Sequence, residues 1–126
     1  MRSWGMDDVA VERVLRTVEA IPTGRVAAYG QIGAIAGVGA RQVGAIMRDW
    51  SRGTAWWRVV NASGELPGPL MARALPHWRE EGIGLRADGR GCRIADHQAD
   101  LATLRMAAQR AFADLPAAPG RKIVQL

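Results

Sequence analysis

Two short amphipathic segments, residues 29–36 and 40–50, lie only three residues apart and restrict the folds open to this chain more than any other feature. Their apolar positions are Ile32, Ile35 and Ala36 in the first segment and Val43, Ile46 and Met47 in the second. This spacing predicts two helices that each bury one face, and Gly37-Val38-Gly39 between them predicts a tight turn. The pair is typical of the helix-turn-helix motif, although other helical hairpins also turn at glycine.

Helical spacing of apolar residues also predicts three longer helices. The first is expected over residues 8–20, and the second over 70–81, where Pro76 could interrupt it. The third is expected over 96–115, with Leu101, Leu104, Ala108 and Phe112 on one face. The chain is therefore predicted to be mostly helical.

Two segments between these helices predict small β-hairpins. Residues 56–61 are rich in β-formers and precede a turn at 62–65, which predicts the wing of a winged helix. Asp88-Gly89-Arg90-Gly91 predicts the turn of a second hairpin. The expected fold class is mainly α (α+β), a winged helix-turn-helix domain with small hairpins. Its boundaries are expected at residues 7–96, followed by a C-terminal helix at 97–115 and a mobile tail at 116–126.

Arginine is concentrated in the segment that contains the two short helices. The chain has a formal net charge of +5, and residues 25–58 hold five arginines against the single acid Asp49. Such clustering favours an anionic partner such as nucleic acid, whereas solvated surface arginines and an arginine-rich genomic composition are the alternatives. Because Arg41 opens the second short helix and Arg48 follows on it, we favour contact with nucleic acid.

Several function classes are excluded by what the sequence lacks. The single cysteine, Cys92, cannot form an internal disulfide framework or a multi-cysteine zinc site. His77 and His97 have no metal-ligand spacing, and both are expected at the surface. No apolar run reaches the roughly 20 residues of a membrane helix, and the early acids of the N-terminus argue against a secretory signal. A cytoplasmic protein without cofactor or metal is expected, with Cys92 as a small buried residue.

The sequence Trp56-Trp57-Arg58 has two interpretations. If these residues form a strand, the adjacent tryptophans face opposite ways, and at most one enters the core easily. The other could stack on a nucleic-acid base beside an arginine that holds the phosphates. Alternatively, both tryptophans are packing residues.

The region from Val14 to Glu81 resembles the DNA-binding domain of O6-alkylguanine-DNA alkyltransferases. The matching elements occur in the family's order and cover a little over half of the chain. They are Ile21-Pro22-Thr23-Gly24-Arg25-Val26, Tyr29-Gly30-Gln31-Ile32, Ala40-Arg41-Gln42-Val43-Gly44, Arg58-Val59-Val60 followed by Gly64, and Glu81-Gly82. Each element alone is a weak signal, whereas five in register are specific.

The chain departs from that family at its reactive residues. The family's active site is a Pro-Cys-His-Arg run, and the corresponding residues here are Ala55-Trp56-Trp57-Arg58. Trp56 stands at the position of the cysteine and Trp57 at that of the histidine that activates it. An indole cannot become a thiolate, so the chain is similar to the alkyltransferase-like branch. This resemblance implies binding of alkylated DNA without repair.

The resemblance also implies roles for individual residues. Arg41 corresponds to the arginine that fills the stack vacated by a flipped nucleotide, and Tyr29 to the tyrosine that helps to rotate its 3′ phosphate. The helix that carries Arg41 would enter the minor groove, whose degenerate code suits a protein that scans any sequence. Trp56 would form part of the pocket wall, and Val59 and Val60 would offer backbone groups near the edge of the base.

Five further residues complete the expected site. Arg48 is expected to contact a phosphate, whereas Arg58 either contacts DNA or supports the active loop. Trp50 occupies the position of a hinge asparagine, and with Trp57 it is expected to border the pocket. Some relatives sense the alkyl group with an arginine just after the predicted wing, and the first arginine here is Arg73.

The implied partners are duplex DNA that carries O6-alkylguanine and the UvrA-type damage-recognition proteins of nucleotide excision repair. The protein is expected to be monomeric and nucleoid-associated, and to mark the lesion for repair or shield it. Three alternatives stay open. They are a sequence-specific winged-helix regulator, an alkyltransferase that uses Cys92, and a domain that binds only proteins.

Overall fold

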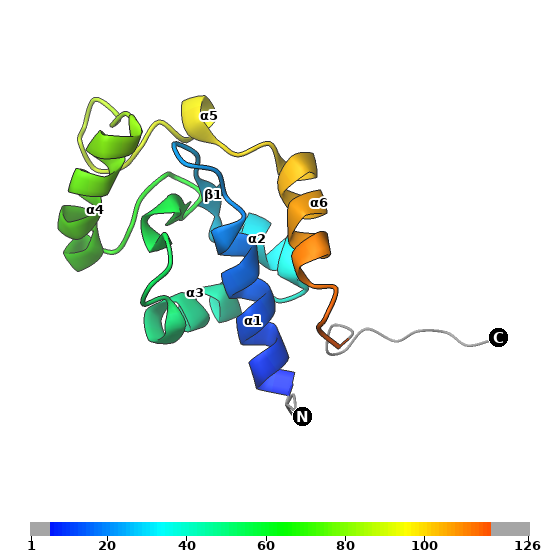
Figure 1. Cartoon of the computed structure of the whole chain (residues 1–126). Coiled ribbons are helices and arrows are strands. Elements are labelled where there is room, and N and C mark those ends of the chain that lie inside the picture. The colour runs from blue at the N-terminus through cyan, green and yellow to red at the C-terminus, as the bar shows by residue number, and fades with distance from the viewer. Residues whose placement is uncertain (1–5, 117–126) are drawn as a thin grey trace.

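Four helices pack around one apolar core in the structure, a computed structural model that describes residues 6–116 (Figure 1). They are α1 (Met6–Glu19), α2 (Tyr29–Ala36), α3 (Ala40–Trp50) and α6 (Leu101–Ala111). This first cluster contains Val14 and Val18 of α1, Ile32 of α2, Val43 of α3 and Leu104 of α6, all 2% exposed or less. None of the helices among the described residues combines the length and the apolar character of a membrane span.

The turn between α2 and α3 depends on two glycines. Gly37 has a φ of 85°, in the left-handed region that favours glycine. The amides of Gly37 and Val38 both donate to the Gly33 carbonyl, at 2.8 and 2.9 Å. A Cβ on Gly33 would lie 2.4 Å from the Val38 carbonyl oxygen, so a side chain there would push the turn away. Both helix boundaries predicted from the sequence are confirmed.

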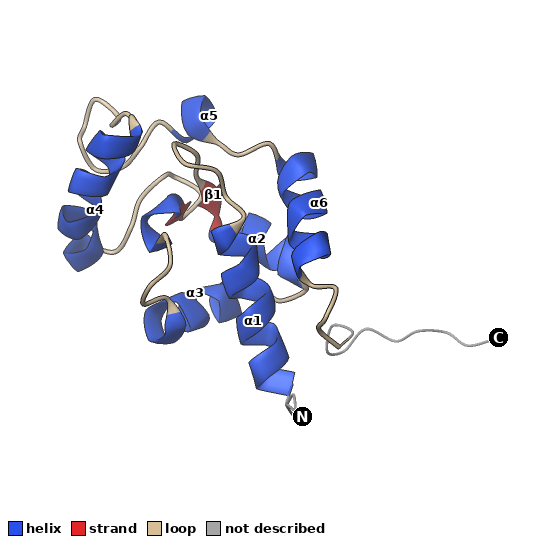
Figure 2. Ribbon diagram, in the orientation of Figure 1, coloured by secondary structure: helices blue, strands red, loops and turns tan. Residues whose placement is uncertain are grey.

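A two-stranded parallel sheet divides the interior. β1 (Ala27–Ala28) pairs with β2 (Val59–Val60) in the register Ala27 with Val59 and Ala28 with Val60. Adjacent strand residues face opposite sides, and accordingly Ala27 and Val59 join the first cluster while Val26 and Val60 join a second. Figure 2 shows how small this sheet is among the helices.

The second cluster lies under α4 (Gly68–Glu81), at the end of the molecule opposite α6 in Figure 1. Its buried residues are Val26, Val60, Leu66, Ala74, Trp78, Ile83 and Cys92. α4 continues through Pro76, which removes one helical hydrogen bond. The buried indole of Trp78, two residues later, holds the helix against the cluster.

The prediction of a β-hairpin wing is wrong, because the strand after the tryptophans pairs with a different segment. Residues 56–58 form a 3-10 turn, η1 (Trp56–Arg58), and the next two residues pair with β1 instead of returning as a hairpin. The expected turn at 62–65 is present, because Asn61 just before it accepts from the amides of Ser63 and Glu65, each at 2.9 Å. The chain then enters α4. The second predicted hairpin is reduced to one antiparallel bridge between Leu85 and Cys92.

The single helix predicted over residues 96–115 is instead two. α5 (Ile94–His97) ends where Val26 donates to the His97 carbonyl and accepts from the Ala99 amide, both at 2.9 Å. This backbone pairing interrupts the helix, and Asp100 then caps α6 by accepting from the Thr103 amide at 3.0 Å. α6 shares the first cluster with α1, so it completes the core. Of the predicted mobile tail, residues 117–126 lie outside the described part of the chain.

The close approach at Gly33 gives a stability test with a control in the same helix. Gly33→Ala should lower the free energy of unfolding by about 2 kcal/mol, because the added methyl overpacks the turn. Gly30→Ala should leave it unchanged or raise it by up to about 1 kcal/mol, since a Cβ there meets nothing within 4 Å. Urea unfolding followed by circular dichroism measures both. Equal effects of the two substitutions would contradict this account of the turn.

Candidate nucleic-acid interface

The exposed side of α3 is basic. Arg41 in its first turn and Arg48 in its last are both exposed, and Arg52 follows in the next loop, also exposed. Arg48 pairs with Asp49 at 3.2 Å, but its side chain is 74% exposed, so this pair is weak and screened by salt. The structure therefore brings positive charge to one exposed helix and the loop that leaves it.

Tyr29 lies at the start of α2 and packs against the first cluster with its ring half-buried. Burial raises the pKa of its phenol, so the hydroxyl stays protonated at neutral pH. A neutral phenol can donate a hydrogen bond to a phosphate oxygen. α2 begins here because Gln31 reaches back to accept from the Ala28 amide at 2.9 Å.

The residues Trp56–Arg58, the tryptophan turn, connect α3 to β2. Because a 3-10 turn has three residues per turn, the two indoles do not face opposite ways as a strand would require. Trp56 is half-buried and packs against both apolar clusters. The prediction from the strand pattern is therefore wrong for this pair, and both tryptophans pack while remaining partly exposed.

Arg58, the last residue of the tryptophan turn, fixes the turn to neighbouring segments through its guanidinium group. Its Nε and Nη2 donate to the two carboxylate oxygens of Glu81 at 2.9 and 2.8 Å. Its Nη1 donates to the Ile21 carbonyl at 3.0 Å, and Nη2 also donates to the Thr23 hydroxyl at 3.1 Å. With its side chain only 14% exposed, Arg58 has its donors committed within the protein. The structure thus favours support of the loop over contact with DNA.

Glu81, at the end of α4, receives four hydrogen bonds. Besides the two from Arg58, it accepts from the Gly24 amide at 2.9 Å and from Trp57 Nε1 at 2.8 Å. Burial alone would raise the pKa of this carboxyl, but the bonds from Arg58, Gly24 and Trp57 outweigh it and hold the pKa below its ordinary value. Glu81 is therefore ionised at neutral pH.

His77 stacks on Trp57, a contact that sequence reasoning missed. The two ring centroids are 3.7 Å apart and the planes differ by 6°. Trp78 Nε1 donates to the Trp57 carbonyl at 2.7 Å, and the Arg73 guanidinium lies 5.7 Å from the centre of the Trp56 ring. The spacing of Arg73, His77 and Glu81 by four residues was the available signal, because it places all three on one face of a helix.

The other predicted site residues lie elsewhere. Val59 and Val60 are buried to 1% and 0% exposure, so only their backbone could reach a ligand. Trp50 is 59% exposed at the end of α3. His97 is half-buried and accepts from the Gly84 amide at 2.9 Å, which corrects its expected surface position. His77 is likewise half-buried.

Nucleophilic chemistry has no support at the tryptophan turn. An indole nitrogen is a hydrogen-bond donor only, and that of Trp57 is directed at Glu81. Cys92 is fully buried in the second cluster, as expected, and burial raises the pKa of its thiol. Among the described residues, no group of three or more His, Cys, Asp or Glu side chains could hold a metal ion.

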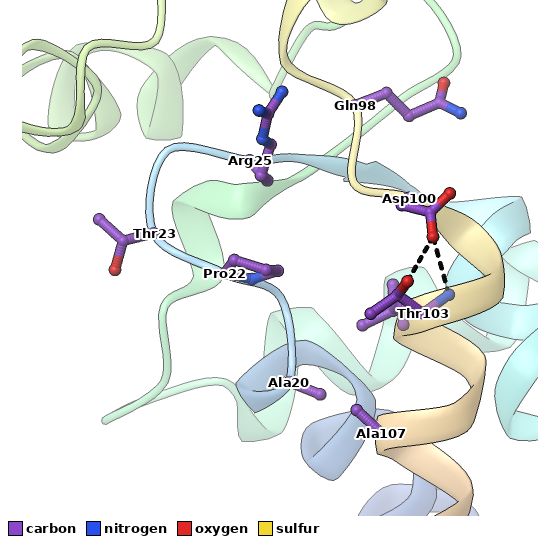
Figure 3. A pocket seen from close by; sticks show the side chains of 9 residues that line it. Ala20, Pro22, Thr23, Arg25, Gln98, Asp100, Thr103 and Ala107 are labelled. Carbon is purple, nitrogen blue, oxygen red and sulfur yellow. Dashed lines mark hydrogen bonds between the residues drawn. The ribbon is translucent and has the colours of Figure 1, made fainter.

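A cavity of about 470 Å³ opens between residues 20–25 and the start of α6. Figure 3 shows its lining, in which the Asp100 carboxylate is occupied by Thr103. Its lining residues are Ala20, Pro22, Thr23, Arg25, Gln98, Asp100, Thr103, Leu104 and Ala107. None of the predicted DNA-contacting or pocket residues is among them.

Comparison with known families accounts for this arrangement. Residues 10–83 match the family of the 6-O-methylguanine DNA methyltransferase DNA-binding domain. The chain belongs to this family. Membership confirms the resemblance inferred from the sequence, and with it the helix-turn-helix class of the fold.

Two curated relatives are similar to this chain over about two thirds of their length. The DNA base-flipping protein of Escherichia coli (strain K12) is 36% identical over 89 residues, covering 66% of this chain and 69% of that protein. The protein of the same name from Shigella flexneri gives the same values. A solved structure, S. pombe Atl1 in complex with damaged DNA containing O6-carboxymethylguanine, matches with a TM-score of 0.62 and 27% identity. That match covers 75% of this chain and 97% of the chain in the solved structure.

The Arg58–Glu81 pair predicts a stability difference that depends on pH. Glu81→Gln should lower the free energy of unfolding at neutral pH by about 3 kcal/mol, because it leaves a buried guanidinium without its counter-charge. Since the folded pKa of Glu81 is lowered, its contribution is present above the ordinary carboxyl pKa of about 4.3 and is lost as the pH falls through the folded value. Urea unfolding at several pH values measures this, with exposed Glu80→Gln as the matched control. Equal stability of the two variants would contradict the role given to the pair.

Proposed function

We propose that this protein binds O6-alkylguanine in duplex DNA by rotating the damaged nucleotide out of the helix, and that it does not transfer the alkyl group. The observation that carries the proposal is the tryptophan turn, which offers an indole where the resemblance places the reactive cysteine. The relatives support the same function, since two are named DNA base-flipping proteins and Atl1 was crystallised with DNA containing O6-carboxymethylguanine. The basic side of α3 supplies the charge that DNA binding needs.

Alkyl transfer requires a nucleophile that this site does not offer. In the alkyltransferases that this chain resembles, a cysteine thiolate attacks the alkyl carbon. Trp56 has no ionisable group to act as that nucleophile, and Trp57 has no basic atom to take a proton from a nucleophile. The only thiol, Cys92, is buried against the backbone of Gly64 and has a raised pKa. The complex would therefore form and dissociate without a covalent step.

Flipping costs a few kcal/mol of lost stacking and pairing, which side chains on α2 and α3 would offset. Arg41 would enter the duplex from the minor groove and occupy the vacated stack. Tyr29 would donate its hydroxyl to the phosphate of the rotated nucleotide, and Arg48 would contact a neighbouring phosphate. Arg58 is left out of this contact set, because its donors hold the tryptophan turn.

The flipped base would lie against the half-buried Trp56, with Trp57 behind it and Arg73 at the rim. Arg73 is exposed, and its guanidinium lies near the Trp56 ring, which suits contact with a π-face. Val59 and Val60 would contribute only backbone groups. Trp50, exposed at the end of α3, would border this pocket on the DNA side.

Because a binder leaves the lesion in place, other proteins must remove it. We infer that the complex marks the lesion for the UvrA-type damage-recognition proteins of nucleotide excision repair. A monomer in the cytoplasm, associated with the nucleoid, fits this role. The second candidate, a sequence-specific regulator, uses the same helix-turn-helix but requires tight binding to one undamaged sequence.

The first prediction concerns lesion preference. A short duplex with a single O6-methylguanine should bind more tightly than the same duplex with guanine, measured by fluorescence anisotropy at one fixed salt concentration because phosphate contacts depend on salt. Mass spectrometry of the same samples should find the protein mass unchanged. Equal binding to both duplexes would favour the regulator. An added methyl mass would establish an alkyltransferase, and negligible binding at low salt would favour a protein-interaction domain.

The second prediction distinguishes a specific role of Arg41 in flipping from the general attraction of positive charge to DNA. Arg41→Ala should reduce affinity for the modified duplex about tenfold or more, because nothing then fills the vacated stack. Arg105→Ala, which removes an exposed arginine from α6, is the matched control and should change affinity little. Cys92→Ser should also leave binding nearly intact. A variant without Arg41 that keeps the full lesion preference would refute its assignment.

A further inference from the structure

α4 presents one face to the tryptophan turn. Arg73, His77 and Glu81 are spaced by four residues, and each has a partner in the turn: Trp56, Trp57 and Arg58 respectively. Glu81 fixes the buried end of the turn through hydrogen bonds. Arg73 is exposed at the other end. His77 lies between them, and neither the family resemblance nor the charge pattern gives it a role.

His77 contacts both tryptophans through its ring. It stacks on Trp57 with centroids 3.7 Å apart, and it meets Trp56 edge-on at 6.0 Å with an interplanar angle of 77°. Trp56 and Trp57 also meet edge-on, at 5.8 Å and 83°. The two edge-to-face contacts have a favourable geometry for aromatic pairs, and the imidazole lies flat on the Trp57 indole. The three rings therefore form one mutually ordered group.

Trp57 is also restrained by packing against the second cluster, by the Arg58 guanidinium 5.7 Å from its ring centre, and by two hydrogen bonds. Its Nε1 donates to Glu81, and its carbonyl accepts from Trp78. Neither hydrogen bond contacts a face of the indole ring. The parallel imidazole of His77 covers one face at 3.7 Å between centroids, much closer than the Arg58 guanidinium at 5.7 Å, so it is the tightest ring-face contact among these. A fixed Trp57 in turn presents a fixed surface to the edge of Trp56.

We propose that His77 is a positioning residue, which holds Trp57 and through it the Trp56 wall of the lesion pocket. This inference rests on the proposed function, since it assigns Trp56 to the flipped base. His77 acts on lesion preference, because the wall meets only a nucleotide that has left the duplex. Affinity for undamaged DNA depends on the phosphate contacts of α2 and α3, which His77 does not touch.

The test compares His77→Ala with His77→Phe. Removal of the ring should reduce the preference for an O6-methylguanine duplex over the guanine duplex by about fivefold, the order of one aromatic pair. Phenylalanine retains a flat ring and should restore most of the preference. Affinity for the guanine duplex should stay within about twofold in both variants, since their phosphate contacts are intact. Arg79→Ala, at an exposed position elsewhere on α4, is the matched control.

Circular dichroism of the indole bands gives a second measurement that needs no DNA. The Trp56–Trp57 pair should contribute a coupled signal, identified as the part lost in Trp57→Phe. His77→Ala should weaken this signal and His77→Phe should retain it. If His77→Ala unfolds, His77→Leu keeps the volume without the stack and takes its place in both measurements.

Each outcome bears on one of the two proposals. Unchanged lesion preference and an unchanged indole signal in His77→Ala would overturn the positioning role and leave lesion binding intact. Equal losses for both duplexes would also overturn it, because His77 would then support the fold in general. If the unmodified protein has no lesion preference, the proposed function fails, while the indole signal still decides whether His77 orders the two tryptophans.

Discussion

The ion pair between Arg58 and Glu81 holds together three segments that are distant in sequence. It connects the tryptophan turn to the end of α4, and the same two side chains bind the Ile21 carbonyl, the Thr23 hydroxyl and the Gly24 amide. Both side chains are largely buried, at 14% and 8% exposure, so neither can lose its partner without leaving a charge in a poorly solvated site. The position of both tryptophans against α4 depends on this pair.

The short sheet divides the remaining buried side chains between the two apolar clusters. In each strand region two consecutive apolar side chains, Val26-Ala27 and Val59-Val60, are divided between the two clusters. Two-residue strands contribute few hydrogen bonds, but their alternation places Trp56 where the clusters meet. The helix-turn-helix belongs to the first cluster and α4 to the second. The tryptophan turn therefore lies at the junction of the part proposed to bind DNA and the part that supports the pocket.

The sequence predicts those elements of the fold that depend on the local spacing of apolar residues. Helices α2 and α3 have the predicted boundaries because their apolar spacing and the glycine turn are local features. The sheet was mispredicted because β2 pairs with a segment some thirty residues earlier in the chain, and no local pattern encodes that partner. The break before α6 has the same cause, since Val26 takes its backbone bonds from residues 97 and 99. Among the site residues, Arg41 and Trp56 are indicated by the charge pattern and the Trp-Trp-Arg run, and the family resemblance supplies their specific roles. The stacking of His77 on Trp57 instead depends on how α4 packs.

The burial of Cys92 and the indole at position 56 have a consequence for how many molecules a cell would need. An alkyltransferase that takes the alkyl group onto its own cysteine is consumed once per lesion. In the proposed function no bond is made, so each copy leaves the DNA unaltered and can visit another site. The supply required is then set by how long each complex lasts, and a small, constant pool could survey many lesions in turn.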